Sequence, residues 1–261
     1  GRKGDLHEAI VDLTEAIRLN PTDAFAYYSQ GYAYEGMGDF GTAIADYTHA
    51  IRLDPKYGKA YFPRAYAYSR NIEYDNAIAD YSEAIRLEPK NASAYYNRGW
   101  IYEEQGRLDD AIADYTEAIR LDPSNSNPIA HRGMAYGKKG DFDKAIADLT
   151  ETIRLDPNDA RAFCNRGIAY RRKGNFDSAI SDFTQAIQLD TNNAYAYYHR
   201  GCTFEEEGDL DQALADFTEA IRADPKNARI FHRRGIVYAK KREPSKATAD
   251  YAEAKKLGFG T

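Results

Sequence analysis

The sequence repeats itself every 34 residues, and no other feature constrains its fold as strongly. Position 8 of each repeat is small, position 11 is aromatic and position 20 is always alanine. A fixed period of this length is typical of arrays built from one small unit, in which neighbouring units stack to bury a shared core. Seven consecutive segments align without insertion or deletion, and they begin at Ala24, Gly58, Ala92, Ser126, Ala160, Ala194 and Ala228.

Each segment contains two stretches with apolar residues at helical spacing. A glycine such as Gly38 or Gly208 separates the two stretches in most segments, where a left-handed residue can end the first helix. A proline such as Pro55 or Pro123 follows the second stretch and ends it. The pattern therefore predicts two antiparallel helices per segment and an all-α fold, because a single hairpin cannot bury its own apolar face.

We expect a single array over residues 1–261. Residues 5–23 match only the second helix of a repeat, with Ala9, Leu13 and Ala16 in its apolar columns. Because the array starts within a hairpin, we expect the natural array to extend further or to belong to a larger protein. The full repeats are expected at 24–57, 58–91, 92–125, 126–159, 160–193, 194–227 and 228–261.

These columns resemble the tetratricopeptide repeat (TPR) family, which has an aromatic residue at position 4, glycine at 8, tyrosine at 11, alanine at 20 and 27, an aromatic at 24 and proline at 32. The resemblance covers nearly the whole chain. It implies a right-handed superhelical solenoid of antiparallel helix hairpins, here seven full repeats plus an N-terminal half repeat. It also implies that the first helices line a concave groove that binds a peptide.

Two columns depart from the family pattern together. Position 7 is glutamine in the first repeat (Gln30) and arginine in every later one, and position 23 is always aspartate. A bidentate arginine–carboxylate pair tolerates partial burial well. The two columns therefore predict an Arg–Asp ladder between first and second helices, either within a repeat or across a repeat junction.

The groove positions carry an excess of aromatic and cationic residues. Aromatic side chains are enriched at the energetic centres of interfaces, and Trp100 is the best single candidate. Contact with a ligand and packing along the groove both remain open for the aromatic residues. The candidate binding residues are Phe25, Tyr28, Tyr32, Phe62, Tyr66, Tyr96, Trp100, Arg161, Arg171, Tyr195, Tyr198, Arg229 and Arg233.

Charge along the groove favours one kind of partner. The C-terminal half is cationic at these positions, which favours an acidic peptide segment or a terminal carboxylate. Two known subclasses of the family are excluded. The chaperone-tail clamp needs a lysine at position 5, and no repeat has one. The asparagine ladder of sugar-transferase arrays needs asparagine at position 6 throughout, and only some repeats have it.

Repeat two is irregular, with Pro63 inside its first helix and Ile72 where a glycine is expected. Proline removes a backbone hydrogen bond from a helix interior. We therefore expect a shortened or bent first helix in this repeat.

Other functional classes find little support. Cys164, His199 and Cys202 fall at groove positions, but zinc needs four converging ligands, so we expect no metal site and no cofactor. A net charge of −6 argues against nucleic-acid binding. No apolar run is long enough to span a membrane. With two cysteines we expect a reducing, cytoplasmic location.

Three functional hypotheses follow. The leading one is a non-catalytic protein–protein interaction scaffold that binds a peptide or partner segment in its concave groove. The second is a self-assembling array whose ends stack on another copy. The third is the substrate-recognition arm of a larger enzyme whose catalytic part lies outside these residues.

Overall fold

The computed structural model describes residues 2–260 of the chain, including the side chains of residues 5–260. Over that range the chain forms fifteen α-helices and no strand. The chain divides into two compact parts, which we call unit 1 (residues 1–128) and unit 2 (residues 129–261). The all-α prediction is confirmed.

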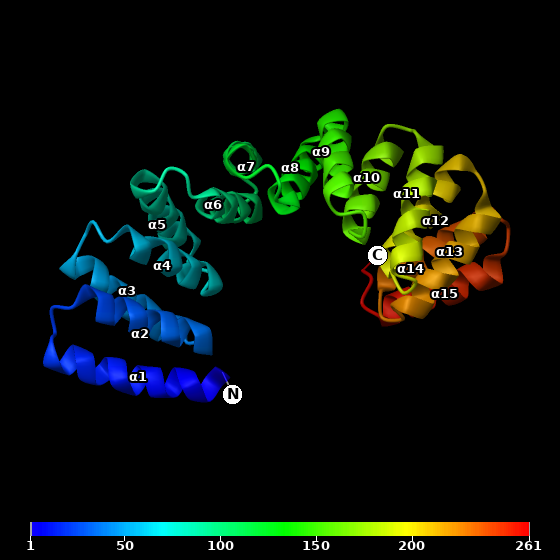
Figure 1. Cartoon of the computed structure of the whole chain (residues 1–261). Coiled ribbons are helices and arrows are strands. Elements are labelled where there is room, and N and C mark those ends of the chain that lie inside the picture. The colour runs from blue at the N-terminus through cyan, green and yellow to red at the C-terminus, as the bar shows by residue number, and fades with distance from the viewer. Residues whose placement is uncertain (1, 261) are drawn as a thin grey trace. The chain divides into compact units, whose positions relative to one another are not determined.

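Unit 1 is a stack of helices in which each packs against the next along the chain (Figure 1). First helices alternate with second helices, and α2, α4 and α6 are first helices. The helices of unit 1 are α1 (Arg2–Leu19), α2 (Ala24–Met37), α3 (Phe40–Leu53), α4 (Gly58–Arg70), α5 (Tyr74–Leu87), α6 (Ala92–Glu104) and α7 (Leu108–Leu121).

Unit 2 has the same organisation, and the boundary between the units falls within α8 (Ser126–Lys139). From α9 onward each helix again packs against its successor. All seven first helices begin at the first residue of an aligned segment. The remaining helices are α9 (Phe142–Leu155), α10 (Ala160–Arg172), α11 (Phe176–Leu189), α12 (Ala194–Glu207), α13 (Leu210–Ala223), α14 (Ala228–Lys240) and α15 (Pro244–Lys256).

Small residues in the core columns allow the two helices of a hairpin to approach closely. A Cβ atom added to Gly99 would lie 3.0 Å from the ring of Tyr115, so no larger residue fits there without displacing the ring. The position-20 alanines Ala43, Ala77 and Ala111 are fully buried. The aromatic ring at position 24 fills the space between the helices, as expected for a close-packed interior.

The Arg–Asp ladder is present in both units. Each position-7 arginine binds the position-23 aspartate of its own hairpin through Nε and Nη2, at 2.6–2.8 Å. The pairs are Arg64–Asp80, Arg98–Asp114, Arg132–Asp148, Arg166–Asp182, Arg200–Asp216 and Arg234–Asp250. The predicted ladder is confirmed, and the guanidinium groups of these arginines are already paired within the fold.

The third nitrogen of these arginines reaches the preceding repeat. Nη1 of Arg98 donates a hydrogen bond to Oγ of Ser82 at 2.8 Å, and Nη1 of Arg200 donates to Oγ1 of Thr184 at 2.9 Å. Five of these arginines therefore hold three helices together, two in their own hairpin and one in the hairpin before it: Arg64, Arg98, Arg166, Arg200 and Arg234. The sequence contains a serine or threonine at position 25 from Thr14 to Thr218, a signal that could have predicted this contact.

The first hairpin, α2 with α3, lacks this ion pair. Gln30 donates a hydrogen bond to Thr14 at 2.8 Å, which keeps the contact with the preceding helix. The carboxylate of Asp46 is buried, and its Oδ2 atom has no hydrogen-bond partner. Burial raises the pKa of Asp46 to about 6, since removal from water disfavours the charged form.

The irregular repeat differs from expectation. Helix α4 has 13 residues despite Pro63, as many as α6 and α10, so the expected shortening is wrong. One amide hydrogen bond lost near the start of a helix does not end it, because the following turns remain bonded. The departure lies after α4 instead, where Ile72 adopts the left-handed conformation (φ 62°) that glycine adopts after other first helices.

Candidate functional site: the first-helix groove

Aromatic residues at position 5 of the first helices serve the packing of each hairpin. Each ring lies against the position-24 ring of the same hairpin, with centroids 5.6–5.9 Å apart. Offset and edge-to-face contacts at this distance are stabilising. The pairs are Tyr28–Tyr47, Phe62–Tyr81, Tyr96–Tyr115 and Tyr198–Phe217.

Aromatic residues at position 9 face the preceding repeat. The rings of Tyr66 and Phe40 are 6.3 Å apart, and Trp100 lies edge-on to Tyr74 at the same separation. Tyr32 occupies the same column but lines a pocket together with Leu6, and it is 61% exposed. At position 9, Tyr66 and Trp100 therefore pack against the preceding repeat, whereas the ring of Tyr32 is exposed.

The groove of unit 1 contains three adjoining pockets. A pocket of about 260 Å³ is lined by Tyr28, Tyr32, Phe62 and Tyr66, with Glu35, Lys59 and Glu88 among its polar residues. A second pocket, of about 500 Å³, shares Tyr32 and Glu35 and is completed by Asp5 and Leu6. A third, of about 210 Å³, includes Tyr66, Tyr96 and Trp100. Phe25, which is 63% exposed, packs against Tyr28 at 6.4 Å.

Glu35 lines two of the three pockets in the unit 1 groove. Its Oε2 atom accepts a hydrogen bond from the hydroxyl of Tyr47 at 2.8 Å. Burial raises the pKa of Glu35, while the bond from Tyr47 acts in the opposite direction. Glu103 accepts the corresponding bond from Tyr115 at 2.8 Å. The sequence signal for both contacts is a glutamate at position 12 in repeats that have tyrosine at position 24.

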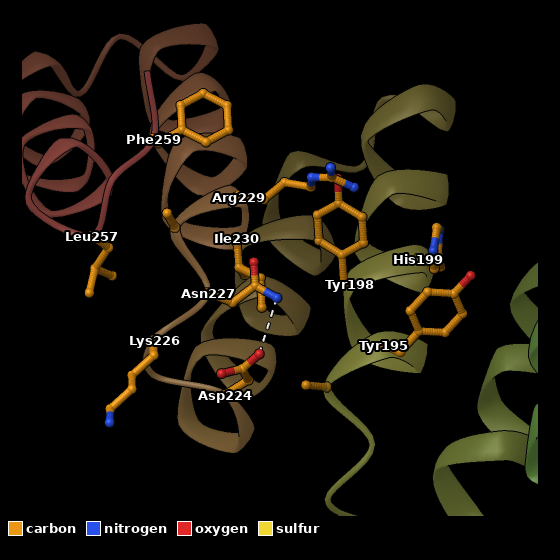
Figure 2. Close-up of a pocket in the computed structure, with 12 residues that line it drawn as sticks. Tyr195, Tyr198, His199, Asp224, Lys226, Asn227, Arg229, Ile230, Leu257 and Phe259 are labelled. Atoms are coloured by element: carbon orange, nitrogen blue, oxygen red, sulfur yellow. Dashed lines mark hydrogen bonds between the residues drawn. The ribbon is translucent and has the colours of Figure 1, made fainter. Parts of the chain in front are cut away.

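The groove of unit 2 contains a pocket of about 690 Å³ between α12, the start of α14 and the segment after α15 (Figure 2). Tyr195, Tyr198 and His199 extend from α12, while Arg229 comes from α14 and Phe259 from the segment after α15. Tyr195 is 52% exposed and Arg229 is also exposed. The pocket thus joins aromatic surface to a positive charge.

His199 forms the inner wall beside this pocket as a neutral side chain. Its ring lies 4.3 Å from Tyr195, 5.1 Å from Tyr198 and 6.0 Å from Phe183. Burial lowers the pKa of His199 to about 3, assisted by the charges of nearby arginines. The imidazole is therefore uncharged at neutral pH, and its buried Nδ1 has no hydrogen-bond partner.

Several groove charges of unit 2 neutralise each other between repeats. Arg171 is 9% exposed and binds Glu206 at 3.1 Å. Glu205 binds Arg233 at 3.5 Å and Lys240 at 2.7 Å. Arg171 and Arg233, both expected to contact a ligand, therefore already have carboxylate partners within the chain. These pairs join adjacent repeats across 28 or 35 residues, a spacing that the helical pattern of one repeat does not reveal.

Other cations of this groove are more available. Arg161 is 88% exposed and lies 3.8 Å from Asp159. Arg229 makes no ion pair with a described carboxylate of residues 5–260. Arg229 is therefore the candidate cation best placed to meet an acidic ligand.

The cysteines and histidines do not form a metal centre in the described part of the chain, where no cluster of three potential ligands occurs. Cys164 and Cys202 are buried free thiols, and burial raises the pKa of Cys164 to about 12. Among residues 2–260, no helix has both the length and the apolar character needed to cross a bilayer.

Family models match most of the chain up to residue 227. Models described as tetratricopeptide repeat match residues 24–57, 62–126, 132–194 and 194–227, and a model described as TPR repeat matches residues 2–38. None of these matches is to an enzyme family. A search of curated protein sequences finds no significant match.

Solved structures share the fold. A tetratricopeptide repeat protein from Parabacteroides merdae has a TM-score of 0.73 at 20% identity, covering 91% of this chain and 94% of that one. YrrB, reported as a TPR protein with an unusual peptide-binding site, has a TM-score of 0.65 at 24% identity, covering 70% and 95%. MamA has a TM-score of 0.56 at 27% identity, covering 61% and 93%.

Proposed function

The chain belongs to the tetratricopeptide repeat family, and we propose that this protein-interaction scaffold binds a peptide segment of a partner protein along its first helices. Binding would use the groove of unit 1, the groove of unit 2 or both. The residues proposed to contact the peptide are Phe25, Tyr28, Tyr32, Phe62, Tyr66, Tyr96, Trp100, Tyr195, Tyr198, Arg161 and Arg229.

The observation that carries this proposal is the exposure of aromatic rings beside pockets on first helices. Phe25, Tyr32 and Tyr195 are 63%, 61% and 52% exposed, whereas Tyr47, Tyr81 and Tyr115 at position 24 are fully buried. Large exposed apolar groups that border a pocket typically mark an interaction site. The peptide-binding site reported for YrrB, a protein of the same fold, supports the proposal.

We further propose that the pocket of unit 2 prefers a peptide with a carboxylate next to an apolar residue. Arg229 and Lys226 line this pocket together with Tyr195 and Tyr198. Asp224, the carboxylate in the same lining, already accepts a hydrogen bond from Asn227 at 3.1 Å. Arg229 forms no ion pair with Asp224 or another described carboxylate. An incoming carboxylate would therefore meet an unpaired Arg229 guanidinium.

A peptide-display selection tests the proposed function. The library is selected on the full chain and counter-screened on Tyr32→Ala and Tyr195→Ala, which remove one exposed ring from each unit. Val11→Ala is the matched control, because Val11 is 67% exposed on α1 and lies outside the pockets. Peptides that bind the wild type and the control but lose affinity for one ring variant are the expected result. Binding that is indifferent to both ring variants would contradict the proposal.

Self-association is a second candidate, favoured by the surface of α1. Ala16 is exposed on this helix, and Ala9 and Leu13 are only half-buried, whereas their column equivalents Ala43, Tyr47 and Ala50 are fully buried. A second copy could cover this face. A molecular mass that rises with concentration in light scattering, and that falls to the monomer value in Leu13→Glu, would support it. A concentration-independent monomer would exclude it.

A further inference from the structure

Glu35 in unit 1 and Glu205 in unit 2 occupy the same position, 12, of their repeats. Glu205 is 5% exposed and is neutralised by two cations from the next repeat, with Lys240 Nζ at 2.7 Å and Arg233 Nη1 at 3.5 Å. This contact shows which chemistry a carboxylate at position 12 accepts. A cation approaches it along the groove from the adjacent first helix.

Glu35 has no such partner among residues 5–260. The only hydrogen bond to its carboxylate comes from the Tyr47 hydroxyl, at 2.8 Å. The residue equivalent to Arg233 in the next repeat is Pro63, which carries no charge. The residue equivalent to Lys240 is Arg70, whose guanidinium instead lies over the ring of Phe40 at 5.5 Å. Neither equivalent position therefore supplies a cation to this carboxylate, because one is proline and the guanidinium of the other lies over Phe40.

The surroundings of Glu35 suit a guanidinium group. Tyr32 and Glu35 are shared by two pockets, of about 260 and 500 Å³, so the Glu35 side chain borders both. Three carboxylates, Glu35, Glu88 and Asp5, line these pockets against one ammonium group, Lys59. Arginine stacks on aromatic rings while it binds a carboxylate, which lysine does less well.

The chain already contains this arrangement in its own ladder. The guanidinium of Arg64 binds Asp80 and lies 5.7 Å from the ring of Tyr61 and 5.8 Å from that of Tyr68. One carboxylate and two tyrosine rings therefore form a complete arginine site in this fold. Glu35, with Tyr28 and Tyr32 in the same pocket lining, presents the same groups to the groove.

We propose that Glu35 and the tyrosine rings beside it form a subsite for an arginine side chain of the partner peptide. The subsite rests on the proposed peptide-binding function, and it gives unit 1 a preference opposite to that of the unit 2 pocket. The peptide would supply the positive charge that Arg233 and Lys240 supply to Glu205.

The first test uses N-acetyl-argininamide as the probe, with N-acetyl-citrullinamide as its uncharged isostere. Both are titrated into the full chain and followed by NMR of tyrosine ring and glutamate carboxyl signals. Saturable shifts at Tyr32 and Glu35 with the arginine probe, and at least tenfold weaker binding of citrulline, are expected.

Glu35→Gln should lose the response while still accepting the hydrogen bond from Tyr47. Glu104→Gln, an exposed groove carboxylate, is the matched control and should retain it. Equal shifts in wild type and Glu35→Gln would overturn the subsite.

The second test separates failure of the subsite from failure of the peptide groove. Each peptide selected on the wild type is resynthesised with arginine replaced by glutamine and measured against wild type and Glu35→Gln. A coupling of about tenfold between the two changes supports the subsite. Peptides that depend on Tyr32 but show no arginine preference and no coupling would overturn the subsite and leave the groove intact. Arginine-probe binding without any selectable peptide would overturn the groove function instead.

Discussion

The first hairpin (α2 and α3) and the sixth (α12 and α13) have the same backbone plan but satisfy their polar groups differently. Position 7 is Gln30 in one and Arg200 in the other, so Asp46 has an unbonded carboxylate oxygen while Asp216 accepts two hydrogen bonds at 2.8 Å. Position 9 is Tyr32, which is 61% exposed, against Cys202, which is 2% exposed.

The groove carboxylates of the two hairpins differ in the same direction. Glu35 has one hydroxyl donor, whereas Glu205 has two cations from the next repeat. The carboxylates Asp216 and Glu205 of the sixth hairpin are thus paired with cations of the chain, whereas Asp46 and Glu35 of the first hairpin are not. In a repeat array the shared columns specify the fold, and departures from them indicate where a partner can bind.

Replacing Arg200 of the sixth hairpin by glutamine, the residue of the first hairpin, should change stability more than any other substitution proposed here. Arg200→Gln leaves Asp216 buried without its ion pair, and loss of one partner from a buried pair destabilises by about 3 kcal/mol. Native-state hydrogen exchange of α12 and α13 amides measures this locally, because repeat arrays do not unfold as one unit. Gln30→Ala is the control in the first hairpin, with an expected loss of about 1 kcal/mol. Equal losses of stability in Arg200→Gln and Gln30→Ala would contradict the difference proposed between the two hairpins.

The reverse change should stabilise the first hairpin. Gln30→Arg supplies Asp46 with a bidentate partner and keeps a donor for Thr14, the contact that Gln30 makes now. A charge-assisted pair in this geometry should add about 2 kcal/mol at pH 7.5, as measured by exchange of α2 and α3 amides. The same substitution should lower the pKa of Asp46. An unchanged stability would mean that the arginine cannot reach the carboxylate.

Removing the charge of Asp46 should stabilise the fold at neutral pH, where the buried carboxylate is ionised. Its folded pKa of about 6 exceeds the ordinary value of 3.8, so the folded state binds the proton more tightly. The stability from this group is fully present below pH 3.8 and is lost as the pH rises through about 6. Asp46→Asn should therefore gain up to about 2 kcal/mol over the wild type between pH 4 and pH 7.5. Asp216→Asn should show no such gain, since Asp216 has its arginine. A flat difference for Asp46→Asn would contradict the account.

The two hairpins agree at the turn, where Gly38 (φ 85°) and Gly208 (φ 97°) end the first helix in the left-handed conformation. Ile72 adopts φ 62° at the equivalent place after α4 and is 73% exposed. A β-branched residue is strained there, so Ile72→Gly should raise the stability of that hairpin by about 1 kcal/mol. Asn71→Gly is the control, because φ is −87° at Asn71, and it should bring no gain.

Much of the fold was predictable from columns, because packing in a repeat array recurs at fixed sequence spacing. The Arg–Asp ladder followed from two columns that changed together. Exposure of groove residues was not predictable, since Tyr32 and Trp100 share a column, yet Trp100 packs on Tyr74 while Tyr32 borders a pocket and is 61% exposed. Pairing of groove charges was missed for the same reason: the partner of Arg171 is on the next first helix.

We propose that the ladder stabilises the array while the exposed rings of the first helices bind the partner. The decisive experiment uses three variants, Tyr32→Ala, Tyr195→Ala and Arg200→Gln. It measures the dissociation constant of a selected peptide and the free energy of unfolding for each. We expect at least one ring variant to lose about tenfold or more in affinity with little change in stability. Arg200→Gln should lose stability while the folded fraction retains wild-type affinity. Full affinity in both ring variants, or a loss of affinity only in step with stability, would contradict it.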